Sequence, residues 1–136
     1  MDEDSAVWSD DYLVNFDIID NQHKELVRMT NDLFEGCKMG STAADVAFVK
    51  TIRDAVEYAQ THFFTEEKYM KMSGYPELVI HKKEHDSFVA EVAKAVQSFE
   101  GGTAEPMALA RFLKNWLFTH IAQTDKKFAP FLVRLK

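Results

Sequence analysis

The stretch "HFFTEEKYM", residues 62–70, places an imidazole at His62 and a carboxylate at Glu66, four residues apart. In an α-helix this spacing puts both side chains on one face, separated by a single turn. The stripe that they continue is apolar and comprises Val49, Ile52, Val56 and Ala59. A histidine and a glutamate at the end of a core-facing stripe predict a polar site inside the protein.

The histidines of the chain indicate what kind of site this is. There are five, at His23, His62, His81, His85 and His120. Each lies on or beside the apolar side of its predicted helix, and at about 1.5 Å per residue all five fall within roughly a turn of one height. Five buried imidazoles without ligands would leave several polar groups unsatisfied, at a cost of ~1–3 kcal/mol each. The pattern therefore predicts a metal site.

The number and type of donors favour two metal ions. One tetrahedral zinc needs four ligands and would leave the other donors without a partner. Six or more nitrogen and oxygen donors without a thiolate suit two octahedral first-row ions, such as iron or manganese, bridged by carboxylates. The second bridging carboxylate is predicted to be Asp125, five residues after His120.

This five-residue step makes a demand on the backbone. A regular helix would leave the side chains of His120 and Asp125 roughly 140° apart around its axis. Both can reach one centre only if the helix ends or distorts between them. Thr124 is placed to cap a short new helix, which is predicted to run through about residue 132.

Four segments with the 3.6-residue hydrophobic period position these donors. They predict helices at about residues 20–38, 43–72, 77–100 and 105–122, preceded by an irregular arm, 1–19, and followed by a short helix at about 125–132. Ser41 or Thr42 can cap the second helix, and Pro76 suits the first turn of the third. Because the connections are four to seven residues long, neighbouring helices are expected to be antiparallel. The expected fold is all-α, an antiparallel up-down-up-down four-helix bundle forming one domain over residues 1–136.

Composition excludes several other classes of protein. The single cysteine, Cys37, permits neither an internal disulfide nor a cysteine metal cluster. The acidic N-terminus lacks the pattern of a signal peptide, and no stretch approaches the roughly 18 apolar residues of a membrane span. A net charge of −6 without a basic stripe argues against nucleic-acid binding. We therefore expect a cytoplasmic protein that neither binds nucleic acid nor inserts into a membrane.

Four motifs together resemble the ligand set of the hemerythrins, specifically the bacterial hemerythrins. They are "DIIDNQHKEL", "HFFTEE", "HKKEH" and "WLFTHIAQTDKKF". The resemblance extends from Trp8 in the arm to the final "DKKFAPFL". It implies a non-haem di-iron centre, bridged by an oxo or hydroxo group, that binds O2 reversibly for carriage, storage or delivery.

The resemblance also implies a role for each donor. One iron would be held by His81, His85 and His120. The other would be held by His23 and His62, and the pair would be bridged by Glu66 and Asp125. The iron with two nitrogens would keep one open position for O2. Leu117, one turn before His120, would roof the oxygen pocket, and Ile121 would line the way in.

Two other functions remain open at this point. The same site could detect O2, NO or redox state as the input domain of a larger signalling protein, with an unidentified signalling partner. It could instead be a di-iron oxidase or a peroxidase-like enzyme, although ferritin-like oxidases use more carboxylates and Glu-x-x-His pairs. This chain has His-x-x-x-Glu and His-x-x-x-His, so we expect O2 binding without enzymatic activity.

A few further residues have simple interpretations. Asp20 and Gln22, which lie beside His23, could support a metal ligand through a hydrogen bond. Cys37, Trp8 and Trp116 are expected to serve in packing.

Overall fold

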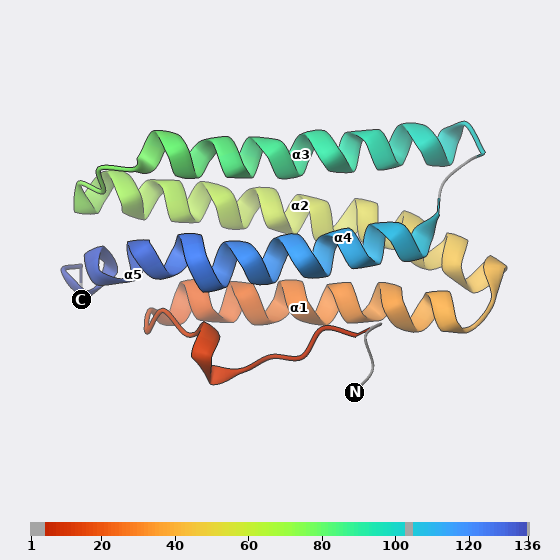
Figure 1. The fold of residues 1–136 in the computed structure, drawn as a ribbon, viewed down its shortest axis with the longest axis horizontal. Coiled ribbons are helices and arrows are strands. Elements are labelled where there is room, and N and C mark those ends of the chain that lie inside the picture. Colours follow the sequence, from red (N-terminus) through yellow and green to blue (C-terminus); the bar gives the residue numbers. More distant parts are fainter. Residues whose placement is uncertain (1–4, 103–104, 136) are drawn as a thin grey trace.

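The computed structural model describes residues 5–102 and 105–135, and within them the chain forms helices and connecting loops without any strand (Figure 1). The long helices are α1 (Asp17–Lys38), α2 (Ser41–Ser73), α3 (Leu78–Glu100) and α4 (Pro106–Thr119). A π-helical segment, η2 (His120–Asp125), continues α4 directly into the short helix α5 (Lys126–Val133). The predicted all-α, up-down-up-down four-helix bundle with a short C-terminal helix is confirmed. The first four residues of the predicted arm lie outside the described residues.

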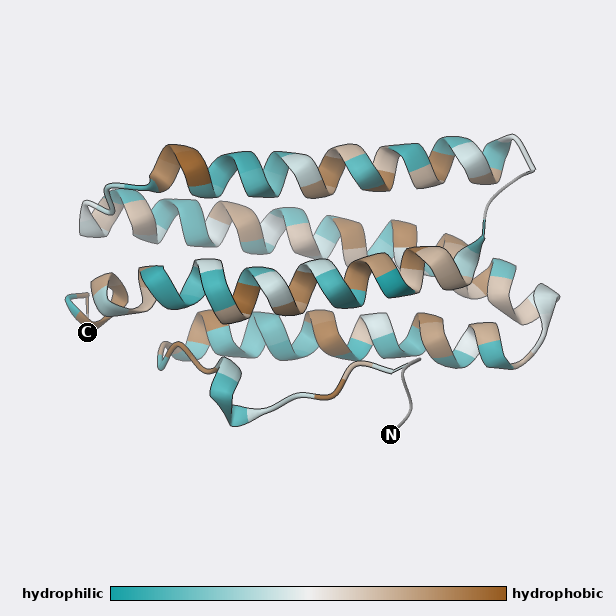
Figure 2. Cartoon of the chain, in the orientation of Figure 1, coloured by the Kyte–Doolittle hydropathy of each residue, from teal (hydrophilic) through white to brown (hydrophobic). Residues whose placement is uncertain are grey.

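The helices are amphipathic and pack against one another through their hydrophobic sides. Helix α1 contacts α2 and α4, α2 also contacts α3, and each helix carries both hydrophobic and hydrophilic residues around its circumference (Figure 2). A larger hydrophobic cluster includes Leu26, Phe63, Phe88 and Leu117, and a smaller one includes Ile19, Met70, Tyr75 and Phe128. Trp8, Cys37 and Trp116 pack against the larger cluster, as predicted. No helix of the described residues is both long and apolar enough to cross a membrane.

The N-terminal arm is fastened to the start of α1, which begins three residues earlier than predicted. The arm contains one 3-10 turn, η1 (Asp10–Tyr12). The carboxylate of Asp20 accepts hydrogen bonds from the backbone N–H groups of Val14 and Phe16, at 2.8 and 3.2 Å. The expected support of a metal ligand by Asp20 is therefore wrong, because both of its oxygens are used to tie the arm to the helix.

The cap predicted for α2 is also wrong. Gly40 occupies the N-cap position with φ of 109°, and no side chain caps the helix. Because only glycine adopts this backbone conformation readily, the chain turns at Gly40 and is already helical at Ser41. Ser41 and Thr42 therefore lie inside the first turn, where their hydroxyls do not act as an N-cap.

In the loop between α2 and α3, the position of Pro76 differs from the prediction. Gly74 ends α2 in the left-handed region with φ of 70°, and the backbone N–H of Tyr75 donates to the carbonyl of Met70 at 2.9 Å. The side chain of Tyr75 is buried in the smaller cluster, and this burial fixes the position of the chain just before α3 begins. Pro76 consequently lies in the turn before α3, whose N-cap is Glu77, and is not in its first turn.

Helices α1 and α2 approach each other closely at Gly36 of α1. A Cβ added at Gly36 would lie 2.4 Å from the Cβ of Ala47 and 3.2 Å from the carbonyl oxygen of Ala43. Neither neighbour has a flexible side chain that could move aside, so a methyl group at Gly36 would push the two helices apart.

We therefore expect Gly36→Ala to lower the free energy of unfolding by about 1–2 kcal/mol, because overpacking outweighs the gain in helix propensity. Gly101→Ala is a matched control, since its added Cβ would meet the carbonyl oxygen of Gln97 at 3.5 Å, an ordinary contact. Urea unfolding of both variants measures the difference. Equal stability of the two variants would contradict the close approach of α1 and α2.

Candidate metal centre

All seven predicted donors lie in one layer of the bundle, which we call the donor layer. It consists of His23 from α1, His62 and Glu66 from α2, His81 and His85 from α3, and His120 and Asp125 from η2. Each of these residues has at most 2% of its surface exposed. On α1, His23 lies between Ile19 of the smaller cluster and Leu26 of the larger one. The donor layer is therefore enclosed by apolar side chains along the bundle in both directions.

The π-helical segment η2 allows His120 and Asp125, which are five residues apart, to face the same site. In a π-helix the hydrogen bonds run from residue i to i+5, so residues five apart lie one turn apart on the same side. The predicted distortion is confirmed, whereas the predicted cap at Thr124 is wrong. The backbone remains helical through Asp125 and Lys126, and the Thr124 hydroxyl instead donates to a carboxylate oxygen of Glu84 on α3 at 2.9 Å.

The donor atoms form two groups that share one carboxylate. The first group is Glu66, His81, His85 and His120, and the second is His23, His62, Glu66 and Asp125. Within each group one donor atom from every residue lies within 4.8 Å of the others. This spacing allows each group to surround one cation, with Glu66 common to both.

Asp125 lies between the same two groups with one oxygen toward each. Its Oδ1 is 3.0 Å from His81 Nε2 and 3.1 Å from His120 Nε2, while its Oδ2 is 3.0 Å from His23 Nε2. Glu66 Oε1 is 3.0 Å from His62 Nε2 and 3.4 Å from His85 Nε2. Both carboxylates can therefore reach donors of both groups, which is the arrangement that bridging ligands require.

Many polar atoms of the donor layer are buried without a hydrogen-bond partner. They are His23 Nδ1 and Nε2, His62 Nε2, both carboxylate oxygens of Glu66, His81 Nδ1, His120 Nδ1, and both carboxylate oxygens of Asp125. Leaving such atoms unsatisfied costs about 1–3 kcal/mol each. Cations that bind the inward-facing nitrogens and oxygens would remove most of this cost. The donor set, with imidazoles, two carboxylates and no thiolate, fits a pair of first-row ions such as iron.

The donors of the layer shift one another's pKa values. Burial opposes the charged form of His81 and His120, but their close contacts with the carboxylates of Asp125 and Glu66 outweigh it and raise the pKa of His81 to about 9 and that of His120 to about 10. Burial also opposes ionisation of Glu66 and Asp125, yet the surrounding imidazoles hold the pKa of both carboxyls below the usual range. Metal binding must displace any proton that these imidazoles hold at a ligating nitrogen.

Two imidazoles are anchored by side chains outside the donor layer. Gln22, one of the two predicted supports, accepts a hydrogen bond from His62 Nδ1 at 2.6 Å. Glu67 accepts one from His85 Nδ1 at 3.0 Å, a contact that the sequence reasoning missed. The signal was the second glutamate of "HFFTEE". With Glu66 facing inward, Glu67 lies about 100° further around α2, on the side that faces α3.

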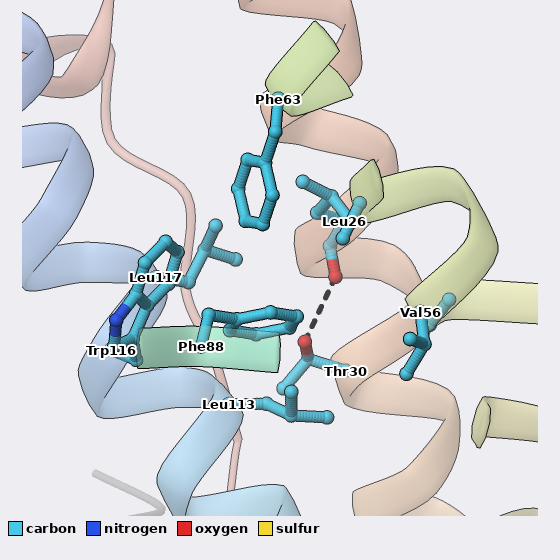
Figure 3. A pocket seen from close by; sticks show the side chains of 10 residues that line it. Leu26, Thr30, Val56, Phe63, Phe88, Leu113, Trp116 and Leu117 are labelled. Atoms are coloured by element: carbon cyan, nitrogen blue, oxygen red, sulfur yellow. Dashed lines mark hydrogen bonds between the residues drawn. The ribbon is translucent and has the colours of Figure 1, made fainter. Parts of the chain in front are cut away.

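An apolar cavity of about 20 Å³ lies among residues of the larger cluster (Figure 3). Side chains from all four long helices line it, including Leu26, Val56, Phe88, Leu113 and Leu117. Two further walls are aromatic rings that touch the donor layer. Phe63 stacks on His85 with ring centroids 4.0 Å apart, and Trp116 stacks on His120 at 4.5 Å. Leu117 therefore lies on this cavity, whereas Ile121 is fully buried and is not one of its lining residues.

Comparisons with known proteins agree with this geometry. The model of the hemerythrin HHE cation-binding domain matches residues 14–132. The chain is 35% identical to a bacteriohemerythrin of Stenotrophomonas maltophilia, over 90% of this chain and 78% of the relative. It is 33% identical to a bacteriohemerythrin of Methylococcus capsulatus, over 87% of this chain and 88% of the relative. A crystal structure of wild-type hemerythrin superposes with a TM-score of 0.81 at 31% identity, covering 93% of this chain and 96% of that one.

The raised pKa values of His81 and His120 predict how the stability of the metal-free protein depends on pH. Because the pKa values of His81 and His120 in the folded state, about 9 and about 10, exceed the ordinary 6.5, the folded protein binds more protons than the unfolded chain above neutral pH. Their stabilisation is complete below pH 6.5 and is lost as the pH rises through 9 and 10.

Urea unfolding of metal-free protein between about pH 7 and pH 10 should therefore show a falling free energy of unfolding. The metal-loaded protein is the control, because bound ions replace these protons, and its stability should not show this decline. A metal-free protein whose stability stays constant or rises over this range would contradict the assignment of these protons.

Proposed function

This chain belongs to the hemerythrin family, and we propose that it binds O2 reversibly at a non-haem di-iron centre in the donor layer. The observation that carries the proposal is the pair of donor groups that share Glu66 and have Asp125 between them. A bound iron pair would supply the electrons that O2 takes up on binding and returns on release. The protein's own residues then have to hold the ions, admit O2 and exclude water.

The proposed ligand assignment follows the two donor groups. His81, His85 and His120 would hold one iron, and His23 and His62 would hold the other. Glu66 and Asp125 would bridge them, which is supported by the Asp125 oxygens facing opposite groups. Because the second iron would have one nitrogen ligand fewer, it is the one that has room for O2.

The apolar cavity supports binding of O2 without further chemistry. Its only hydroxyl-bearing lining residue, Thr30, donates its proton to the backbone carbonyl of Leu26 at 2.9 Å, as Figure 3 shows. Among residues 5–102 and 105–135, no titratable side chain lines this cavity. A small apolar molecule such as O2 is suited to such a space, and no lining group is placed to protonate it. We therefore propose an oxygen-binding protein, not an enzyme, that serves in carriage, storage or delivery.

The proposed setting is the reducing cytoplasm. Cys37 is the single cysteine of the chain, so its fold is not reinforced by an internal disulfide. The proposed ligand is O2 itself, which needs no protein partner to reach the site.

Metal analysis combined with absorption spectra tests the proposal directly. The reduced protein should contain two irons per chain, develop a visible band in air and lose it again when O2 is removed. Glu66→Ala removes the shared carboxylate and should greatly reduce two-iron occupancy. Glu57→Ala, which removes an exposed carboxylate from the same helix, should retain both irons. One metal per chain in the wild type, or two irons with an unchanged spectrum in Glu66→Ala, would contradict the proposal.

Leu117 should slow autoxidation of the centre, in which O2 would be the oxidant, by keeping water and protons away from it. Leu117→Ala would enlarge the cavity next to His120, so autoxidation should accelerate while iron content is unchanged. Leu113→Ala is the matched control, because Leu113 lines the same cavity one turn further from His120. Both changes should cost roughly 2–5 kcal/mol of stability. Decay of the visible band measures autoxidation, and equal decay in the two variants would leave Leu117 with a packing role alone.

A further inference from the structure

The five imidazoles of the donor layer are not held alike. His23, His81 and His120 have no hydrogen-bond partner at Nδ1. His62 and His85 each donate from Nδ1 to a side chain outside the layer, and each belongs to a different donor group. The two groups therefore have one externally anchored imidazole apiece.

The two anchors differ in charge. His62 donates to the neutral amide of Gln22, whose nitrogen in turn donates to Thr65 Oγ1 at 3.4 Å, so that its oxygen faces the imidazole. His85 donates to the carboxylate of Glu67. A carboxylate withdraws the Nδ1 proton more strongly than an amide and thereby increases the electron density at Nε2. In the donor group that contains His85, the anchored imidazole is thus hydrogen-bonded to a negatively charged carboxylate, whereas in the other group it is hydrogen-bonded to a neutral amide.

Glu67 also fixes the direction of the His85 ring. An oxygen acceptor at Nδ1 keeps the proton there and leaves the lone pair on Nε2. That Nε2 points into the donor layer, 3.4 Å from Glu66 Oε1 and 3.2 Å from His120 Nε2. Phe63 holds the face of the ring, with 8° between the two ring planes. The ring is therefore constrained both at its face and at its outer edge.

We propose that Glu67 is a positioning residue that orients His85 and, through its imidazole, stabilises the ferric state of the ion held by His81, His85 and His120. The inference rests on the di-iron function proposed above. Glu67 belongs to neither donor group. Its side chain is 24% exposed, and one of its carboxylate oxygens accepts from His85.

The electronic part of the proposal is tested by a charge-neutralising substitution. In iron-loaded Glu67→Gln protein the amide oxygen can still accept from His85, but the charge is gone, so the reduction potential should rise. Glu84→Gln is the control, because Glu84 is next to His85 in sequence and its carboxylate accepts from the Thr124 hydroxyl and not from an imidazole. The shift should be larger in Glu67→Gln. Equal shifts, or none in Glu67→Gln, would overturn the electronic role.

The orienting part is tested without iron. Zinc competition with a chelator should show an affinity roughly 10–100-fold lower in Glu67→Ala than in the wild type, while Glu67→Gln stays close to the wild type. Equal zinc affinity in all three proteins would overturn the positioning role. The zinc result is independent of O2 binding, so failure of the proposed function in the wild type remains distinguishable from failure of this inference.

Discussion

The structure depends on the burial of seven polar donors in one layer of an apolar bundle. Their inward-facing nitrogens and oxygens lie close together and, in large part, have no hydrogen-bond partner within the protein. The hydrophobic clusters on either side exclude the water that could otherwise solvate them. Positive charge within such a layer stabilises it, because it offsets the cost of the unsatisfied polar atoms. Protons on His81 and His120 can do so in part, and two metal ions can do so more completely.

This constraint explains local features that helix propensity alone does not. The chain adopts a π-helix, a rare conformation, at His120–Asp125, and this conformation lets the Asp125 carboxylate face the same donor layer as His120, five residues before it. The Thr124–Glu84 hydrogen bond fastens that segment to α3, and the Gln22–His62 and Glu67–His85 bonds orient imidazoles from outside. The helices thus supply the position of the donors, and a few polar contacts supply their direction.

Much of this could be predicted from the sequence because it follows from periodicity. The 3.6-residue hydrophobic period predicted the helices, and the short connections predicted their antiparallel order. The positions of the five histidines on the apolar stripes predicted the common height of the donors. The need for a distortion before Asp125 followed from the number of residues per turn. Its form did not, because a break with a cap at Thr124 and a continuous π-helix satisfy the same spacing. The choice depends on the partner of Thr124 on α3, which is a tertiary contact.

The other failures have the same origin. Ser41 and Thr42 are good capping residues, but the turn at Gly40 decides where α2 begins. Asp20 was a candidate support for a ligand, yet it binds the backbone of the arm. The role of Glu67 follows from the sequence only once the residue of α3 that lies opposite it is known. Hydrogen bonds between helices are set by the relative rotation and height of the helices, which a single sequence defines only to about a turn.

The central claim is that the two donor groups bind a pair of iron ions bridged by Glu66 and Asp125. Anomalous diffraction at the iron absorption edge, from crystals of the iron-loaded protein, tests it most directly. We predict two iron peaks inside the donor layer, one bound by His81, His85 and His120 and the other by His23 and His62, with both carboxylates contacting both ions. A single peak, or iron bound outside this layer, would contradict the claim.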